Sequence, residues 1–192
     1  MPFIRESIVT TTSEDGSAHV APLGVIEDGQ FLVIAPFHPS TTLANLRRTP
    51  HACVNYTTDV RVFAGCVSRR RRDWPVVPAD RSGWRLEGAL AHSEVEVVDT
   101  VEDEQRPRFR CRVIHEASHA PFHGFNRAQA AVVEAAILVS RLHMLPPEKI
   151  ESELRYLQIA IDKTAGETER EAWGWLMAAV AAATGTMIGQ AT

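Results

Sequence analysis

The chain has 192 residues, of which 45% are hydrophobic and 23% charged, and this composition is typical of a folded protein with a sizeable core. Its formal net charge of −4 argues against sequence-independent nucleic-acid binding, which needs a positive surface. The start of the chain lacks the basic head and apolar run of a signal peptide, and no apolar stretch stays uncharged for the roughly 18 residues of a membrane span. We therefore expect neither a nucleic-acid nor a membrane partner.

The cysteines indicate a reducing compartment. Cys53, Cys66 and Cys111 are widely spaced, odd in number and form no C-x-x-C pair. We expect them to be free thiols in a cytoplasmic protein.

The first part of the chain alternates between strand-forming runs and turns. Residues 3–12, 20–26 and 31–35 are rich in β-branched and aromatic side chains. Acidic-glycine turns at 14–16 and 27–29 separate these runs. This pattern predicts an antiparallel meander.

A short helix is expected over residues 41–48. Ser40 is a suitable N-cap, and Pro50 stops the helix. Residues 51–57 then alternate into another strand. The apolar piece 60–67 is compatible with either a helix or a strand.

Residues 68–83 are rich in arginine and proline, and we interpret them as a surface insertion. Two long strands are expected over 84–98 and 106–118. Arg108 to Val113 alternate strictly between arginine and apolar residues, which predicts one exposed and one buried face.

The last third of the chain changes to a helical period. We expect helices over 126–145, 148–163 and 167–183, from apolar residues that recur every three to four positions. With strands first and helices last, the fold class is α+β.

Several short motifs recur in a fixed order along the chain. They are Glu6-Ser-Ile-Val-Thr-Thr, Ala21-Pro-Leu-Gly, Thr42-Leu-Ala-Asn45-Leu, Val54-Asn55-Tyr-Thr-Thr-Asp59, and Gly124-Phe-Asn-Arg-Ala128 followed by Glu134 and Ser140-Arg-Leu142. With these motifs the chain resembles an uncharacterised family of small flavoproteins with the FMN-binding split-barrel fold. The resemblance extends from about residue 3 to residue 180, and the insertion at 68–83 lies outside it.

The resemblance implies a six-stranded Greek-key split barrel followed by a C-terminal helical subdomain. The barrel domain would span 1–122, including the insertion 68–83, and the helical subdomain 123–192 would pack on the barrel. The family holds FMN non-covalently, near the interface of a homodimer. We therefore expect FMN as the cofactor and a second copy of the chain as a partner.

The same resemblance implies a set of cofactor-binding residues. They are Ala21, Pro22, Leu23, Gly24, Ser40, Thr41, Thr42, Asn45, Asn55 and Asp59. Ser40 to Thr42 would approach the phosphate, and the start of a helix is a ready anion site. Asn45 and Asn55 would reach the phosphate or the ribityl chain, and the backbone of 21–24 would lie against the isoalloxazine ring.

Structural alternatives to these roles stay open. Ser40 to Thr42 could simply cap a helix, and Asn55 and Asp59 could form turns at a strand end. The cation that neutralises the phosphate is not identified by the sequence. The candidates are Arg5, Arg47, Arg48 and Arg61.

Two further clusters have simple interpretations. His115, His119 and His123 are spaced by four, but Pro121 excludes a helix, and on a strand this spacing is roughly 13 Å. We therefore expect no metal site; an alternative is that these histidines line a substrate pocket.

Arg69 to Arg72 could attract an anionic substrate or nucleic acid, but a solvated loop is favoured.

These observations favour an FMN-dependent oxidoreductase that passes hydride between reduced FMN and a small organic acceptor, for example a heterocycle. The catalytic residues are not identified. The alternatives are a non-catalytic carrier, sensor or scaffold dimer, and a dimerisation domain with a degenerate flavin site. A wide cleft bordered by His115, His119 or His123 would favour the enzyme, and a narrow, filled pocket would favour the carrier.

Overall fold

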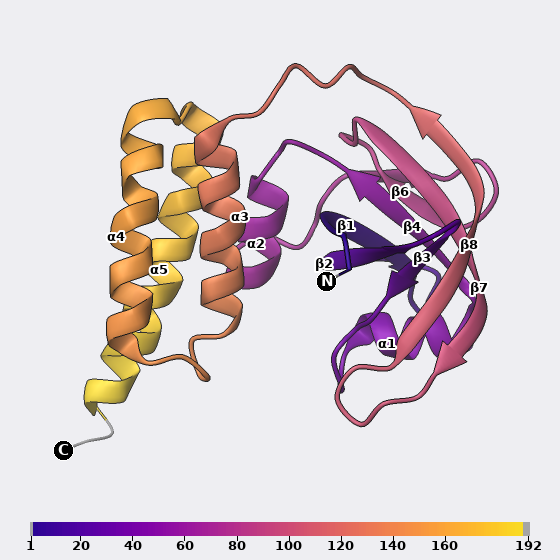
Figure 1. The fold of residues 1–192 in the computed structure, drawn as a ribbon, viewed down its shortest axis with the longest axis horizontal. Helices are drawn as coiled ribbons and strands as arrows, with labels where there is room; N and C mark the ends of the chain where they lie inside the picture. Colours follow the sequence, from indigo (N-terminus) through magenta and orange to yellow (C-terminus); the bar gives the residue numbers. More distant parts are fainter. Residues whose placement is uncertain (1, 190–192) are drawn as a thin grey trace. The chain divides into compact units, whose positions relative to one another are not determined.

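The structure is a computed structural model that describes residues 2–189 and the side chains through residue 183. It divides into two compact units (Figure 1). The barrel unit comprises Met1–Thr58 and Asp73–Phe122, and the helical unit comprises Asp59–Arg72 and His123–Thr192. Residues 59–72, which the sequence-based division assigned to the barrel domain, group here with the helices.

The barrel unit is built on a closed antiparallel barrel. Its strands are β1 (Ile4–Thr12), β2 (Ala18–Asp28), β3 (Phe31–Ile34), β4 (His51–Tyr56), β7 (Ala91–Val101) and β8 (Arg108–Ser118). They are ordered β1-β2-β3-β8-β7-β4, and β4 pairs back with β1 to close the barrel. The six-stranded barrel expected from the resemblance is thus confirmed.

The alternation of side chains along β8 places apolar residues inside the barrel. Along β8, Phe109 and Cys111 are buried, whereas Arg108, Arg110 and Arg112 are exposed, as their alternation predicts. The inward-facing residues of the strands and of the helix over residues 41–48 form one hydrophobic core. Its buried members are Val9, Val25, Ile34, Leu43, Leu46, Ala52, Val54, Val95, Phe109 and Cys111.

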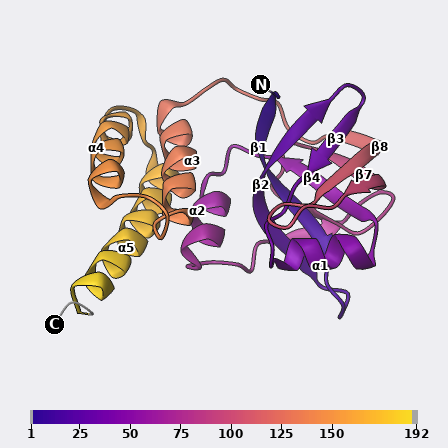
Figure 2. The ribbon, with the colours of Figure 1, turned by 60° about the horizontal axis from the view of Figure 1, so that its bottom comes forward.

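Helix α1 (Thr41–Arg48) has the predicted bounds and lies at one end of the barrel (Figures 1 and 2). Its Leu43 and Leu46 belong to the barrel core, and the helix contacts β1 and β2. Helix α1 therefore packs against β2, the strand that carries the Ala21-Pro-Leu-Gly motif, and against its partner β1.

The segment expected as a surface insertion is partly ordered against the barrel. A two-stranded sheet forms from β5 (Val76–Pro78) and β6 (Trp84–Leu86), and β7 begins only at Ala91. The Leu86 N–H donates to Asn55 Oδ1 at 2.7 Å, and Thr10 Oγ1 donates to the Trp84 carbonyl. The single strand predicted over 84–98 is therefore two strands, because β6 pairs with β5 in a separate two-stranded sheet and only β7 belongs to the barrel.

The helical unit contains α2 (Arg61–Ser68), α3 (Arg127–Ser140), α4 (Pro147–Thr164) and α5 (Glu167–Gly189). Helix α3 contacts the other three through a face of small residues, and Ala128, Ala131, Ala135 and Ala136 are buried there. The undecided piece 60–67 is helical. Within residues 2–189, no helix is long and apolar enough to cross a membrane.

Candidate functional site

The first turn of α1 has the features of an anion site. Ser40 is its N-cap in an extended conformation, and Ser40 Oγ accepts from the Leu43 N–H at 3.3 Å. The first amide groups of a helix have no intrahelical partners, and no acidic side chain lies in this turn. Thr41 is exposed and Thr42 is buried, so Thr41 offers the accessible hydroxyl.

The two asparagines of the predicted site are buried and hydrogen-bonded inside the barrel unit. Asn45 Nδ2 donates to Thr11 Oγ1 at 2.9 Å, which ties α1 to β1. Asn55 Nδ2 donates to the Ile8 carbonyl at 2.9 Å, and Asn55 Oδ1 accepts from the Leu86 N–H at 2.7 Å. Both side chains therefore hold strands and helix together, and their contact with a ligand stays a prediction.

Asp59 belongs to the helical unit, where it precedes α2. Its carboxylate accepts from the Arg61 backbone N–H at 3.1 Å and from the Arg61 guanidinium at 2.7 Å. Arg61 also pairs with Glu171 of α5 at 3.5 Å. The contact of Asp59 with a cofactor likewise stays a prediction.

The Ala21–Gly24 segment is a half-buried part of β2. Its register places Ala21 opposite Val9 and Gly24 opposite Glu6 of β1. A Cβ on Gly24 would lie 2.9 Å from Ile4 Cγ2 and 3.2 Å from Glu6 Oε1. Glycine is needed here because the side chains of β1 approach the backbone closely.

The candidate phosphate cations all have partners in their own unit. Arg5 pairs with Glu27, Arg47 with Glu102 at 2.7 Å, Arg48 with the Thr12 carbonyl, and Arg61 as described above.

Arg106 was not predicted from the sequence as a residue that supports the site. Its guanidinium donates to the Ala35 carbonyl at 2.9 and 3.1 Å and lies 4.4 Å from the centroid of the Phe37 ring. Arg106 thereby braces the segment that leads from β3 to Ser40.

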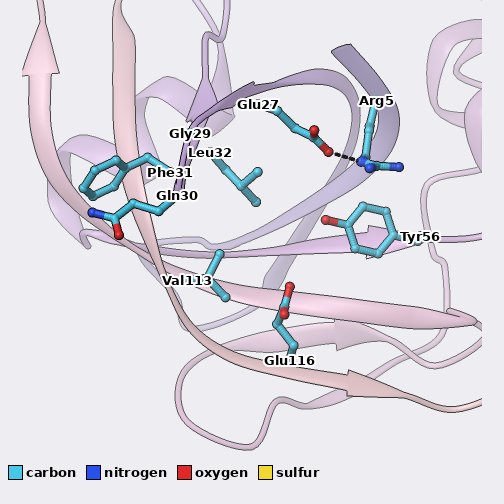
Figure 3. A pocket seen from close by; sticks show the side chains of 9 residues that line it. All are labelled: Arg5, Glu27, Gly29, Gln30, Phe31, Leu32, Tyr56, Val113 and Glu116. Atoms are coloured by element: carbon cyan, nitrogen blue, oxygen red, sulfur yellow. Dashed lines mark hydrogen bonds and ion pairs between the residues drawn. The ribbon is translucent and has the colours of Figure 1, made fainter. Parts of the chain in front are cut away.

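Two adjoining pockets of the barrel unit share Arg5 and Tyr56. The Tyr56 pocket has a volume of about 450 Å³ and is lined by Arg5, Glu27, Gly29, Gln30, Phe31, Leu32, Tyr56, Val113 and Glu116 (Figure 3). The His119 pocket has a volume of about 770 Å³ and is lined by Arg5, Glu6, Tyr56, Thr57, Thr58, Leu90, Ala91, Ser118, His119, Ala120, Pro121 and Phe122. Both volumes fall in the usual range for small-molecule pockets.

Hydrogen bonds organise the Tyr56 pocket. Figure 3 shows Tyr56 and Glu116 extending into the same space from β4 and β8. Ser93 Oγ donates to Glu116 Oε1 at 2.8 Å and lies 3.3 Å from Tyr56 Oη. Because the single Ser93 proton is used on Glu116, the Tyr56 hydroxyl is the donor to Ser93. The phenol and the carboxylate are thus linked through one serine.

Backbone hydrogen bonds build a wall of the His119 pocket. The Leu90 carbonyl accepts from the N–H groups of His119 and Ala120 at 2.7 and 3.1 Å, and the Leu90 N–H donates to the Tyr56 carbonyl at 2.8 Å. The His119 ring stacks on His92 with 5.0 Å between ring centroids. Burial lowers the pKa of His119, with further lowering from the positive charge of Arg85.

The pockets and α1 contact opposite ends of β1. Asn45 of α1 binds Thr11, whereas Arg5 and Glu6 line the pockets. Thr11 is six positions beyond Arg5 on the strand, or roughly 20 Å away. Through its pairing with β1, the Ala21–Gly24 segment covers the interval between these two ends.

The histidines that sequence reasoning considered together do not form one group. His115 and His119 belong to the barrel unit, whereas His123 belongs to the helical unit. His92 was missed, although it stacks on His119 and its ring centroid lies 6.0 Å from that of His115. The register of β7 with β8 brings these rings together, and the spacing along the sequence does not reveal that register.

Solved structures resemble this fold. The FMN-bound protein MM1853 from Methanosarcina mazei is 20% identical, with a TM-score of 0.79, and the match covers 93% of this chain and 96% of that chain. The styrene monooxygenase flavin reductase from Pseudomonas putida (20% identity, TM-score 0.52) matches over 62% of this chain and 83% of its own. Flavoredoxin from Methanosarcina acetivorans (19%, TM-score 0.51) matches over 62% and 69%. No curated protein matches the chain.

The barrel order and these matches define a split-barrel protein of the α+β class with a C-terminal helical region. Family models match most of its length. The model described as "Protein of unknown function (DUF447) N-terminal domain" covers residues 5–120, and "Protein of unknown function (DUF447)" covers residues 126–178. The chain belongs to this family, and the resemblance stated from the sequence motifs is confirmed.

Proposed function

We propose that this chain binds FMN and is an oxidoreductase that passes hydride between reduced FMN and a small organic acceptor. The observation that carries the proposal is the split barrel itself, which aligns over 93% of this chain with the FMN-bound M. mazei protein. FMN would supply the redox chemistry, and the protein would supply binding, orientation and access.

The start of α1 fits the phosphate end of the cofactor. Ser40 fixes the helix start, Thr41 exposes its hydroxyl, and no carboxylate lies in the first turn to repel an anion. Thr42 is buried beside Thr41 and completes the proposed phosphate segment. Asn45 and Asn55 have a supporting role in this proposal, because their hydrogen bonds hold α1 and β4 to β1.

The backbone of Ala21–Gly24 is the proposed platform for the isoalloxazine ring. This segment covers the part of β1 between the residue that binds α1 and the residues that line the pockets. Pro22 has no N–H, so the strand leaves a gap in its hydrogen-bonding ladder there. A cofactor laid along the segment would have its phosphate at α1 and its ring toward the pockets.

The His119 pocket is the proposed acceptor site. Its volume of about 770 Å³ is large enough for a small organic molecule, and His119 borders it. An open pocket of this size bordered by His119 favours an enzyme, because a non-catalytic carrier is expected to have a narrow, filled pocket. No side chain has to act as a nucleophile, because the cofactor performs the transfer.

A homodimer and a cytoplasmic location are parts of the same proposal. Large apolar side chains are exposed on α4, where Tyr156 and Ile159 are 75% and 47% exposed, and they are candidates for an interface. Sedimentation equilibrium should give twice the 21.2 kDa chain mass, and a monomer would contradict the dimer. Cys53, Cys66 and Cys111 form no disulfide, which is consistent with a reducing compartment.

Reoxidation of the bound flavin tests the proposed reaction. The FMN-loaded chain is reduced anaerobically and mixed with a panel of heterocyclic acceptors while the absorbance of oxidised flavin is followed. We expect saturable reoxidation by at least one acceptor, and we expect Ala120→Trp, which fills the His119 pocket, to raise the half-saturating concentration about tenfold. Ala130→Trp on the exposed face of α3 is the matched control.

If bound reduced FMN reacts with every acceptor no faster than free reduced FMN, the proposal of hydride transfer to an organic acceptor is wrong. The chain would then be a flavin-binding carrier. An unchanged half-saturating concentration in Ala120→Trp would instead remove the His119 pocket from the proposal.

A further inference from the structure

We propose that Asp80, His92, Glu94 and His115 form a binding site for one divalent transition-metal ion of the zinc type. The site lies in the barrel unit and does not depend on the flavin function proposed above. It draws ligands from strands β7 and β8 and from the turn between β5 and β6.

The fold brings these residues together from distant parts of the sequence. His92 and Glu94 are two apart on β7, so their side chains leave the same face of the strand. His115 is the cross-strand partner of Glu94 on β8. Asp80 comes from the turn between β5 and β6, the ordered part of the predicted insertion.

Three of the distances between donor atoms are close to those around a tetrahedral ion. Each residue offers one nitrogen or oxygen atom, and these atoms all lie within 4.8 Å of one another. Asp80 Oδ2 is 3.2 Å from His115 Nε2 and 3.8 Å from His92 Nε2, which is itself 3.5 Å from Glu94 Oε1. Bonds of about 2.0–2.1 Å to a tetrahedral zinc ion require donor atoms roughly 3.3–3.4 Å apart.

Hydrogen bonding alone accounts poorly for His92. Its Nδ1 lies 2.8 Å from His119 Nε2, so that nitrogen is already used. Its Nε2 makes one long hydrogen-bond contact, 3.5 Å from Glu94 Oε1, and lies 3.8 Å from Asp80 Oδ2, whereas an ordinary N–H···O bond is 2.7–3.2 Å. With the ring proton on Nδ1 and donated to His119, the Nε2 lone pair is directed toward the donor cluster. His119 then acts as the outer partner that orients a metal-binding histidine.

One side of the cluster is rigid and the other is open. The side chains of His92 and Glu94 are 0% and 1% exposed, whereas those of Asp80 and His115 are 57% and 29% exposed. Glu94 accepts backbone N–H groups of Asp80, Arg81 and Ser82 at 2.8–3.2 Å, which fixes both the carboxylate and the turn that carries Asp80. An ion can thus enter from solvent into a site whose buried half is already oriented.

The ligand set indicates the type of ion and its role. Two imidazoles with two carboxylates suit Zn²⁺, whereas Ca²⁺ and Mg²⁺ prefer oxygen ligands throughout. Four protein ligands close the coordination sphere, which is typical of a structural site. The ion would join the β5–β6 turn to strands β7 and β8.

Metal binding to the untagged, chelator-stripped chain tests the site directly. Zn²⁺ affinity is measured by competition with a chromophoric chelator, bound metal by elemental analysis, and geometry by the visible absorption of the Co²⁺-loaded chain. We expect one ion per chain, a dissociation constant below about 1 μM, and an intense tetrahedral Co²⁺ spectrum. Because flavin is not involved, the result is the same with or without FMN.

Variants identify the ligands. Asp80→Asn and His115→Gln, both at partly exposed side chains, are expected to weaken Zn²⁺ binding at least tenfold and abolish the Co²⁺ spectrum. His119→Gln is expected to weaken binding about 10–100-fold by loosening His92. The controls Asp99→Asn and His143→Gln, exposed elsewhere, should keep the wild-type affinity. Circular dichroism confirms that each variant is folded.

Two results would overturn the proposal. One is a stripped, folded chain that takes up less than about one tenth of an equivalent of Zn²⁺ or Co²⁺ at concentrations well above 1 μM. The other is an affinity that Asp80→Asn and His115→Gln leave at the wild-type value. Either outcome would make the cluster a histidine–carboxylate network without a metal.

Discussion

At the scale of single residues, some predicted ligand contacts are buried side chains that hydrogen-bond within the barrel unit, whereas others are exposed to solvent. Asn45 and Asn55 have the residue type expected of ligand contacts, yet both amides are hydrogen-bonded inside the barrel unit. Sequence alone could not foresee this, because their partners Thr11, Ile8 and Leu86 lie 34, 47 and 31 residues away. Thr41 is exposed at the helix start and is therefore the informative position for a ligand test.

Thr41→Glu should weaken FMN binding roughly tenfold and leave riboflavin binding unchanged. The new carboxylate would repel the phosphate, and riboflavin has no phosphate. Two like charges about 4 Å apart cost about 1 kcal/mol in water and about 4 kcal/mol near a protein surface, so a tenfold loss of about 1.4 kcal/mol corresponds to a well-solvated pair. The same carboxylate favours the helix N-terminus, so folding is preserved. Fluorescence titration with both flavins measures the two dissociation constants.

Thr100→Glu is the matched control, since Thr100 is also exposed in the barrel unit but lies on β7. It should change neither affinity. Equal losses for FMN and riboflavin in Thr41→Glu would remove α1 from the phosphate site.

At the scale of elements, the sequence predicted helices and strands correctly where a periodic pattern was bounded by a cap or a proline. Helix α1 has the predicted bounds because Ser40 and Pro50 delimit it, and β8 follows its arginine alternation. Helix α2 was ambiguous because eight mostly apolar residues fit a buried strand equally well. The break between β6 and β7 was missed because β6 pairs with β5, and only the tertiary structure reveals that pairing.

The start of α5 gives a prediction about pH. Glu169 Oε2 accepts from the Gly166 N–H at 3.0 Å, and Glu169 Oε1 accepts from Gln129 of α3 at 3.2 Å. Burial raises the pKa of Glu169, but these hydrogen bonds outweigh it and hold the pKa below the ordinary 4.5. The stabilisation is therefore complete above pH 4.5 and is lost as the pH falls through the lower pKa of the folded state.

Glu169→Gln should accordingly lower the free energy of unfolding by about 0.5–1 kcal/mol at pH 7, through loss of the charge at the helix N-terminus. At a pH below the pKa of the folded state the difference from wild type should vanish. Urea unfolding at the two pH values measures it, with the exposed Glu134→Gln of α3 as the control. A difference that persists in acid would show that packing, and not charge, is responsible.

At the scale of the whole molecule, the order of the motifs along the chain was more informative about the fold than any single residue. Their order along the chain predicted the family, which the family models confirm, and the six-stranded barrel, which the strand order and the match to the M. mazei structure confirm. The grouping of residues 59–72 with the helices was not predicted, because their contacts are with α3 and α5, far along the chain. The cluster of Asp80, His92, Glu94 and His115 was missed for the same reason, since it depends on the register of β7 with β8.

FMN binding by the purified chain can be measured without knowing the acceptor or the catalytic residues. The purified chain is incubated with excess FMN, passed through a desalting column and examined by absorbance spectroscopy. We expect flavin bands to stay with the protein at about one FMN per chain, with a band shape altered from that of free FMN. A colourless protein that is folded by circular dichroism and takes up no FMN would show that the chain is not a flavoprotein.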